Sequence, residues 1–288
     1  MKPLNYISQA IAQLRSVSQL CRCVAPKSAQ GIDFVVGLLR KAVIFRLPDN
    51  GIIIDSEFKA IPSVFHLPYP VVAAEFYCPG DRESGKCIAL AFEKQQEDWD
   101  GLGYNVAGIS KASISLIAIE CATSDKEWAP SPWMLKIPNQ NISLPRLRGV
   151  QVELLPEIAN SPRSYPDGAT KDEMYQSNAR CVCAILNLIE VLSCANTSIE
   201  TIPAPKTVNK KRIANGKLPF YEYKILTLDP AGQRSQVKSN ALGTHASPRV
   251  HLRRGHIRRL RDKKIWINAT VVGNRKSGMV VKDYEVKA

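Results

Sequence analysis

Apolar residues recur at intervals of three and four near the start of the chain, which is the period of an α-helix. Between residues 4 and 21 these positions are Leu4, Ile7, Ile11, Leu14, Val17 and Cys21, with polar side chains between them. One such stripe predicts an amphipathic helix that packs one face on a core. Cys21 and Cys23 form a C-x-C pair, which we interpret as thiols at the helix end, with metal binding as the alternative.

Short apolar runs follow, separated by segments that contain Pro and Gly. They cover residues 43–47, 51–55, 70–77, 86–93 and 112–120. Runs of this length that are rich in β-branched residues predict strands. We therefore expect a mostly antiparallel sheet that the first helix covers.

Two acidic residues interrupt these apolar runs, Glu75 within one and Glu120 at the end of another. Carboxylates at strand ends bind metal ions or move protons in many nucleases. The alternative is that each points to solvent or pairs with an arginine. Both are secondary candidates.

The region from residue 123 to 167 is rich in proline and has no clear period, so we expect a connection with an edge strand at 134–137. Trp128 and Trp133 either close one end of the sheet or stack on a base. The strongest helix signal follows at 170–194. It begins with a T-x-x-E capping box of Thr170 and Glu173.

The last part of the chain reads as a linker followed by strands. Residues 202–217 contain two prolines and the basic run NKKR, and we expect a flexible, exposed crossing there. Residues 220–228 alternate as a strand. The segments KIWINATVVG and MVVKDYEV flank the turn NRKSG, which predicts a β-hairpin.

These elements predict an α+β protein with two parts. Residues 1–204 form a helix-covered sheet domain, and residues 205–288 form a basic, β-rich C-terminal module. The apolar fraction of 45% and the charged fraction of 23% are ordinary for a folded globular protein.

Charge separates these two parts sharply. The net charge is +13. Residues 205–288 hold 20 Lys and Arg against 5 Asp and Glu, whereas the preceding residues hold 19 basic against 21 acidic side chains. An excess confined to one end of a chain indicates an anionic partner, nucleic acid above all.

The basic excess is densest at HASPRVHLRRGHIRRLR, where six arginines and three of the four histidines fall within seventeen residues. Guanidinium groups bind phosphate oxygens in bidentate geometry, and Trp266, like Tyr221 and Tyr223, either stacks on a base or packs within the module. The candidate nucleic-acid-binding residues are Arg249, Arg253, Arg254, Arg258, Arg259, Arg261, Lys263, Lys264, Trp266, Arg275 and Lys276.

The histidines allow two further hypotheses. His251 and His256, with His245 in support, are candidate catalytic residues of metal-independent RNA cleavage, in which one imidazole removes a proton and another donates one. Zinc binding is opposed by the surrounding arginines, so we expect no metal ion and no cofactor. Whether the chain is an enzyme stays open at this point.

No run of eighteen apolar residues exists, and the first residues lack the apolar core of a secretory signal. We therefore expect a cytoplasmic protein with no membrane partner, in which the eight cysteines are reduced. The sequence does not indicate an oligomeric state.

The signature H-x-S-P-R-x-H-x-R-R-G-H, followed by IWINATVVG and SGMVVKDYEV, resembles the C-terminal part of a group of uncharacterised phage and prophage proteins. LPYPVVAAEF and KKRIANGKLPFYEYKIL resemble other parts of the same group. The resemblance implies a phage-type setting in the host cytoplasm. It also implies host or phage nucleic acid, RNA or DNA, or the host defence machinery as partner. Docking of the basic module on an acidic host protein is a further hypothesis.

Overall fold

The structure is a computed structural model. It describes residues 5–53, 66–79, 85–93, 113–122, 126–138, 151–154, 171–228, 249–253, 256–267, 270–272 and 274–279. Two compact units make up the chain. The first comprises Met1–Ile53, Phe58–Glu190 and Ile199–Leu226, and the second Ile54–Glu57, Val191–Ser198 and Thr227–Ala288. The boundary expected after residue 204 stays a prediction.

A mixed sheet of eight strands has the order β6-β5-β4-β3-β2-β1-β8-β7. The strands are β1 Val43–Arg46, β2 Val71–Cys78, β3 Gly85–Glu93, β4 Ser113–Ala122, β5 Trp128–Pro138, β6 Gln151–Leu154, β7 Thr197–Ile202 and β8 Tyr223–Leu228. Strands β2 to β6 pair in antiparallel fashion, whereas β1 is parallel to both β2 and β8.

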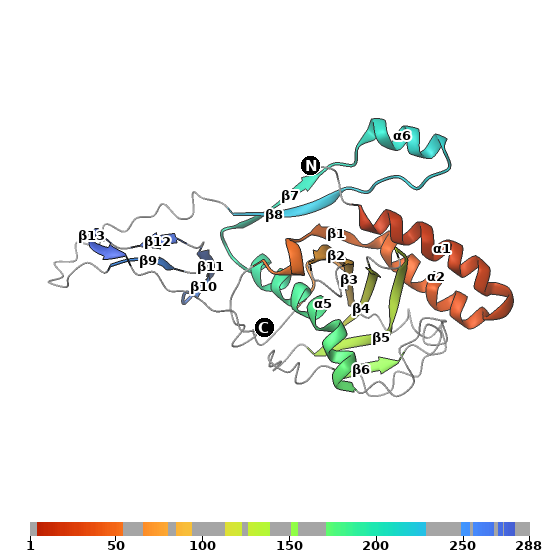
Figure 1. Ribbon diagram of the computed structural model, residues 1–288, viewed down its shortest axis with the longest axis horizontal. Coiled ribbons are helices and arrows are strands. Elements are labelled where there is room, and N and C mark those ends of the chain that lie inside the picture. Colours follow the sequence, from red (N-terminus) through yellow and green to blue (C-terminus); the bar gives the residue numbers. More distant parts are fainter. Residues whose placement is uncertain are drawn as a thin grey trace. The chain divides into compact units, whose positions relative to one another are not determined.

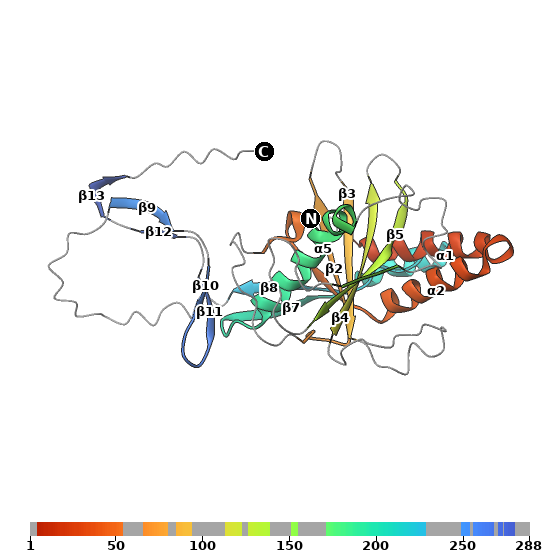
Figure 2. The same ribbon diagram turned by 90° about the horizontal axis from the view of Figure 1, so that it is seen from below.

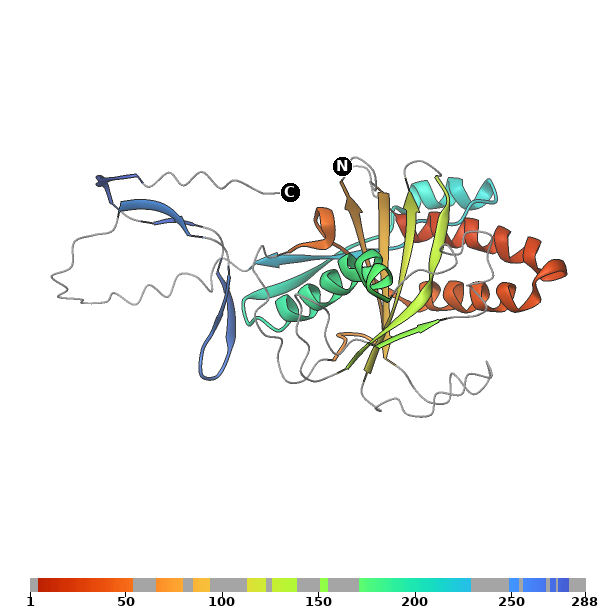
Figure 3. The ribbon, with the colours of Figure 1, turned by 60° about the horizontal axis from the view of Figure 1, so that its bottom comes forward.

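Four α-helices lie among the described residues, so the predicted α+β class is confirmed. They are α1 Tyr6–Val24, α2 Pro26–Lys41, α5 Lys171–Leu192 and α6 Lys206–Ala214. Figures 2 and 3 show α1 and α2 together on one face of the sheet and α5 on the other. The described residues contain no helix that is long and apolar enough to cross a membrane.

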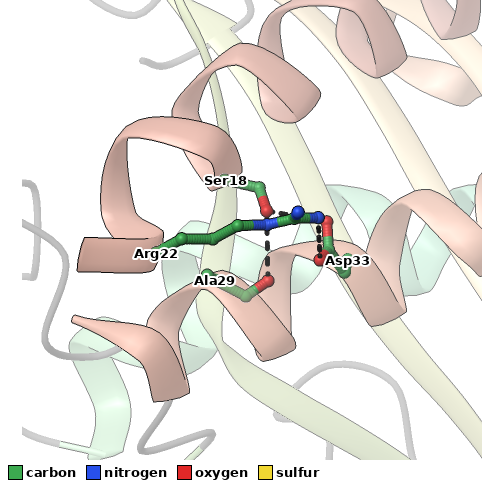
Figure 4. Close-up of polar contacts among 4 residues, drawn as sticks. All are labelled: Ser18, Arg22, Ala29 and Asp33. Atoms are coloured by element: carbon green, nitrogen blue, oxygen red, sulfur yellow. Dashed lines mark hydrogen bonds and ion pairs between the residues drawn. The ribbon is translucent and has the colours of Figure 1, made fainter. Parts of the chain in front are cut away.

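Helices α1 and α2 pack against each other as an antiparallel pair, with polar contacts near the end where the chain reverses (Figure 4). Ser18 Oγ donates to Asp33 Oδ1 at 2.7 Å and lies 3.4 Å from the Ala29 carbonyl oxygen. Arg22 pairs with the other Asp33 oxygen at 3.3 Å. The Ser18 contacts are partly or fully buried and fix the helix pair more strongly than the exposed ion pair does.

The face that α1 and α2 cover has large apolar side chains. Ile7, Ile11 and Leu14 of α1 belong to the same buried cluster as Ile88 and Leu90 of β3. Because side chains alternate along a strand, residues 89 and 91 of β3 face the other way, toward α5. Each face therefore has its own core.

The face under α5 combines large side chains such as Phe76 and Leu116 with small ones, among them Ala74, Ala89 and Ala118, and all five are buried. Gly51 also lies here, in the short 3-10 helix Asp49–Gly51, with φ of 69°. A Cβ at Gly51 would stand 2.6 Å from Ala184 Cβ of α5. Close packing of α5 on this face therefore depends on the absence of a side chain at Gly51.

The helices predicted at 4–21 and 170–194 are confirmed as α1 and α5, and most of the predicted strands are present. Thr170 lies outside the described residues. The strand predicted at 51–55 is wrong in its described part, because residues 49–51 form the 3-10 helix and Ile53 lies in a bend. Left-handed backbone at Asn50 and Gly51 interrupts extended structure there.

Three other predictions need correction. The edge strand at 134–137 is part of the longer β5, which pairs with β4 and β6 and is therefore interior. The flexible crossing at 202–217 is largely the helix α6 (Figure 1). Pro205 precedes this helix, where a proline costs no hydrogen bond.

In the second unit, the predicted C-terminal hairpin is wrong in its described part, and residues 280–286 of its second strand lie outside the described residues. Strands β12 (Thr270–Val272) and β13 (Asn274–Met279) both pair with β9 (Arg249–Arg253), in the order β12-β9-β13. The expected turn NRKSG is part of β13 itself. A different hairpin joins β10 (His256–Arg259) to β11 (Lys264–Ile267).

Candidate nucleic-acid interface

Helix α6 and the segment that follows it form one structured element, the α6 segment, which we define as Lys206–Tyr221. The helix ends at Ala214, and Gly216 takes φ of 67° just beyond it, as glycines after helices commonly do. Figures 1 and 3 show α6 lying alongside α1. None of the nine helical residues is buried, so contacts outside the core must hold the helix.

Two side chains of α6 form hydrogen bonds with the segment that returns to the sheet. The Asn209 amide donates to the Phe220 carbonyl at 2.8 Å and accepts from the Phe220 N–H at 2.7 Å, as a neighbouring strand would. Arg212 Nε donates to the Leu218 carbonyl at 2.8 Å, and its guanidinium carbon lies 4.1 Å from the centre of the Phe220 ring. This cation–π contact and these hydrogen bonds fix the helix in place.

The returning segment is in turn attached to α1. Asn5 Nδ2 donates to the Tyr221 carbonyl at 2.9 Å, and Ser8 Oγ donates to the Pro219 carbonyl at 2.9 Å. Leu218 and Tyr221 pack against the core cluster under α1. The α6 segment is therefore anchored to the first unit at both polar and apolar points.

The exposed side chains of this anchored segment include four cations. Four lysines of the segment are exposed and form no ion pair with any described residue: Lys206, Lys210, Lys211 and Lys217. Sequence reasoning treated this stretch as a linker and missed them as site residues. A proline before the run and a glycine after it were the available signals of a helix.

A second group of exposed cations lies on the β10–β11 hairpin. Arg258, Arg261 and Lys263 are exposed and form no ion pair with a described residue. The turn is closed by a hydrogen bond from the Leu260 N–H to the Lys263 carbonyl at 2.8 Å. Lys264 differs, since its ammonium group donates to Ser193 Oγ at 3.2 Å.

Most of the remaining predicted residues lie in strands whose position is described but whose side chains are not. The others lie outside the described residues. Arg249, His251 and Arg253 belong to β9, His256 and Arg259 to β10, Trp266 to β11, and Arg275 and Lys276 to β13. His245 and Arg254 lie outside the described residues. His251 and His256 belong to different small sheets, and their catalytic role stays a prediction.

Glu75 is 2% exposed, and its carboxylate accepts from the Ile7 N–H at 2.7 Å and also from the Tyr6 N–H. It thus binds free N–H groups in the first turn of α1. Burial raises the pKa of Glu75 to about 7, against the lowering effect of these hydrogen bonds and of Arg46. The Glu75 carboxylate therefore lies inside the core, where it accepts hydrogen bonds from the N-terminal end of α1.

The aromatic candidates Trp128, Tyr221 and Tyr223 pack in or against the core cluster under α1. Trp128 is 4% exposed, and its ring centre lies 5.8 Å from that of Tyr6. Tyr221 and Tyr223 are half-buried against the same cluster. Packing therefore accounts for these rings. Glu120 is exposed, and the side chain of Trp133 is not described.

Among the described residues, no three His, Cys, Asp or Glu side chains are grouped as potential metal ligands. The chain matches no protein-family model, no curated protein and no solved structure. The functional argument therefore rests on the geometry and charge of the chain itself.

Proposed function

We propose that this chain binds nucleic acid, with RNA or single-stranded DNA favoured, through the α6 lysines and the basic residues of the C-terminal cluster. One observation carries the proposal. Four exposed lysines of the α6 segment, three on the helix and Lys217 just beyond it, form no ion pair with a described residue, and side-chain hydrogen bonds hold the segment in place. A fixed array of this kind binds a polyanion without first having to order its own backbone.

The distribution of charge supports the same partner. The exposed cations of α6 and of the β10–β11 hairpin belong to the 84 residues that hold 20 basic and 5 acidic side chains. Each cation that neutralises a phosphate releases counterions from the nucleic acid, which drives binding. Arginines in the cluster add bidentate contacts that lysines do not make.

A membrane surface fits α6 less well. Helices that bind in the plane of a bilayer present a continuous apolar face opposite their cations. The large apolar side chains exposed on α6 are Val208 and Ile213. They are five positions apart, about 140° around the helix, and form no common face.

The setting that we propose is a phage or prophage one, which rests on the resemblance of the H-x-S-P-R-x-H-x-R-R-G-H signature alone. Two alternatives belong to the same proposal. One is RNA cleavage by His251 and His256, and the other is docking of the basic residues on an acidic host protein.

The test is a binding titration of the full chain with labelled single-stranded RNA over a range of salt concentrations. We expect a variant with Lys206, Lys210, Lys211 and Lys217 changed to Gln to lose about 100-fold in affinity near physiological salt, with a salt slope smaller by about 3. The matched control changes Lys27, Arg40 and Lys41, exposed cations of α2, to Gln and keeps its affinity.

A flat response to salt, or equal loss in the control variant, would contradict the proposal. The same samples distinguish the alternatives. RNA that shortens in EDTA near pH 6.5, and stays intact with His251→Ala, indicates the cleaving enzyme. A protein captured by the chain after nuclease treatment, and lost with the α6 variant, indicates docking on an acidic protein.

A further inference from the structure

Two buried thiols face each other on neighbouring strands of the sheet. Cys78 is the last residue of β2 and Cys87 lies near the start of β3. Their Sγ atoms are 3.4 Å apart, and the residues are 0% and 5% exposed. In the register, Cys78 pairs with Gly85 and Cys87 with Phe76, so the two cysteines are diagonal neighbours. A disulfide would need the sulfurs to approach by about 1.4 Å.

The pair lies on the α5 face, among charged groups. The hydrogen bond between the two thiols lowers the pKa of Cys78, and Arg180 of α5, which hydrogen-bonds the same sulfur, lowers it further against the raising effect of burial. The exposed Glu120 opposes this effect. The same hydrogen bond raises the pKa of Cys87, and burial adds to the increase. Cys78 therefore carries the negative charge when the pair loses a proton.

Cys78 is buried but close to the surface. Arg180, whose side chain contacts its sulfur, is an exposed residue, and Pro79, which follows it, is exposed as well. Arg180 is therefore a side chain that both contacts the Cys78 sulfur and reaches the solvent. Reactive thiols are found in such settings, beside a cation and just under the surface.

We infer that Cys78 and Cys87 form an oxidation site, at which a hydroperoxide oxidises Cys78 and Cys87 then closes an intramolecular disulfide. In the first step the Cys78 thiolate attacks one peroxide oxygen. An S–O bond forms, the O–O bond breaks, the sulfur loses two electrons, and the departing oxygen takes up a proton. In the second step Cys87 Sγ attacks Cys78 Sγ, the S–O bond breaks, and the Cys87 proton leaves with the hydroxide as water.

The chain offers internal comparisons for this reactivity. Cys121 is buried on the opposite face of the sheet, within the core under α1. Cys181 lies near the pair on α5, fully buried, and burial raises its pKa well above the ordinary value. We expect neither to react as readily as Cys78, because thiolates rather than thiols attack peroxides.

The experiment uses the full chain with Cys21 and Cys23, at the end of α1, changed to Ser. Hydrogen peroxide is added below one equivalent, free thiols are then alkylated, and peptides are mapped without reduction. We expect a linked Cys78–Cys87 peptide, formed at least about ten-fold faster than any oxidation of Cys121. A further Cys87→Ser variant should accumulate sulfenic acid at Cys78, which a 1,3-diketone probe traps.

An Arg180→Gln variant tests the role of the guanidinium, and we expect the first step to slow by about ten-fold while Arg180→Lys retains most of the rate. Cys121→Ser is the matched control and leaves the rate unchanged. Oxidation of Cys121 as fast as Cys78, or linkage of Cys78 to Cys181, would overturn the inference. The peptide mapping is also done on the chain that keeps both Cys78 and Cys87. It therefore tests the inference even if the Cys87→Ser variant folds poorly.

Discussion

The sheet with its covering helices and the basic residues of the C-terminal part use opposite kinds of side chain. The sheet strands β2 to β4 are almost wholly buried and apolar, and the few polar groups inside, such as Glu75, are hydrogen-bonded. The α6 segment buries no helical residue and is held by Asn209 and Arg212. The difference teaches that stability and the proposed binding depend on separate residues, which substitutions can test.

The largest effect that we expect is on the sheet side, at Gly51. A Gly51→Ala change places a methyl group 2.6 Å from Ala184 Cβ and keeps a left-handed backbone that alanine disfavours. Together these should lower the free energy of unfolding by about 3 to 4 kcal/mol, measured by urea denaturation. RNA affinity of the folded fraction should stay the same.

Gly37→Ala is the matched control for this change. Gly37 lies inside α2, and a Cβ there meets nothing within 4 Å. Alanine should stabilise the helix by about 0.5 to 1 kcal/mol. If both substitutions had the same effect, the close approach of α5 at Gly51 would not be the constraint that the structure indicates.

The next effect is a pH dependence of stability at Glu75. Its pKa is about 7 in the folded chain and 4.5 ordinarily, so between these values the folded state holds a proton that the unfolded state has lost. Stability from this group is therefore full below about pH 4.5 and falls as the pH rises through 7. Glu75→Gln keeps an oxygen acceptor for α1, and its stability relative to the natural chain should increase by about 2 to 3 kcal/mol between pH 5 and pH 8.

Glu93→Gln provides the comparison for this prediction. The Glu93 carboxylate also accepts a backbone N–H, from Leu67 at 2.7 Å, but its side chain is 39% exposed. Denaturation curves of both variants compare a buried carboxylate with a part-exposed one that accepts the same kind of hydrogen bond and also lies 3.5 Å from His66 Nδ1. If the free energy of unfolding changed with pH in the same way for Glu75→Gln and the natural chain, the prediction that the buried Glu75 carboxyl controls this pH dependence would be wrong.

The smallest effects are expected on the basic side, at the β10–β11 hairpin. Changing Arg258, Arg261 and Lys263 to Gln should weaken RNA binding by about 30-fold near physiological salt. The melting temperature should hardly move, since surface substitutions of this kind rarely exceed about 0.5 kcal/mol. Fluorescence anisotropy and thermal melts measure the two quantities on the same samples.

Asp262 lies at the tip of the same hairpin and is exposed, which allows a change of charge in the opposite direction. Asp262→Asn should strengthen RNA binding by about three-fold, because it removes a repulsion from the phosphates. Should both hairpin variants bind as the natural chain does, the proposed interface would reduce to the α6 lysines.

The strands β2, β3 and β4 could be predicted from the sequence because their apolar runs are long and are bounded by turns. Helix α2 was not predicted, since Gly31 and Gly37 interrupt a pattern that tertiary packing nevertheless makes helical. Helix α6 was interpreted as a linker because its sequence shows two prolines and a basic run. Its stability comes from Asn209 and Arg212, whose partners lie beyond the helix and have no signal in local periodicity.

The candidate site divides in the same way. An excess of positive charge in the last 84 residues could be read directly from composition. Which cations stand exposed on ordered backbone, such as Lys210 on α6 or Arg258 on β10, depends on contacts between distant residues. The diagonal contact of Cys78 and Cys87 depends likewise on strand register, which apolar runs alone do not specify.

The parallel pairing of β1 with β8 joins Phe45 to Lys224. As the chain leaves the ribosome, β2 can align with β1 early, but the other side of β1 has no hydrogen-bonding neighbour until almost 180 further residues have been made. That side is a bare strand edge throughout this interval, of the kind that recruits other chains. The nascent protein is thus exposed to misassembly until β8 pairs with β1 in the eight-stranded sheet. This strand order therefore creates a need for chaperones during synthesis.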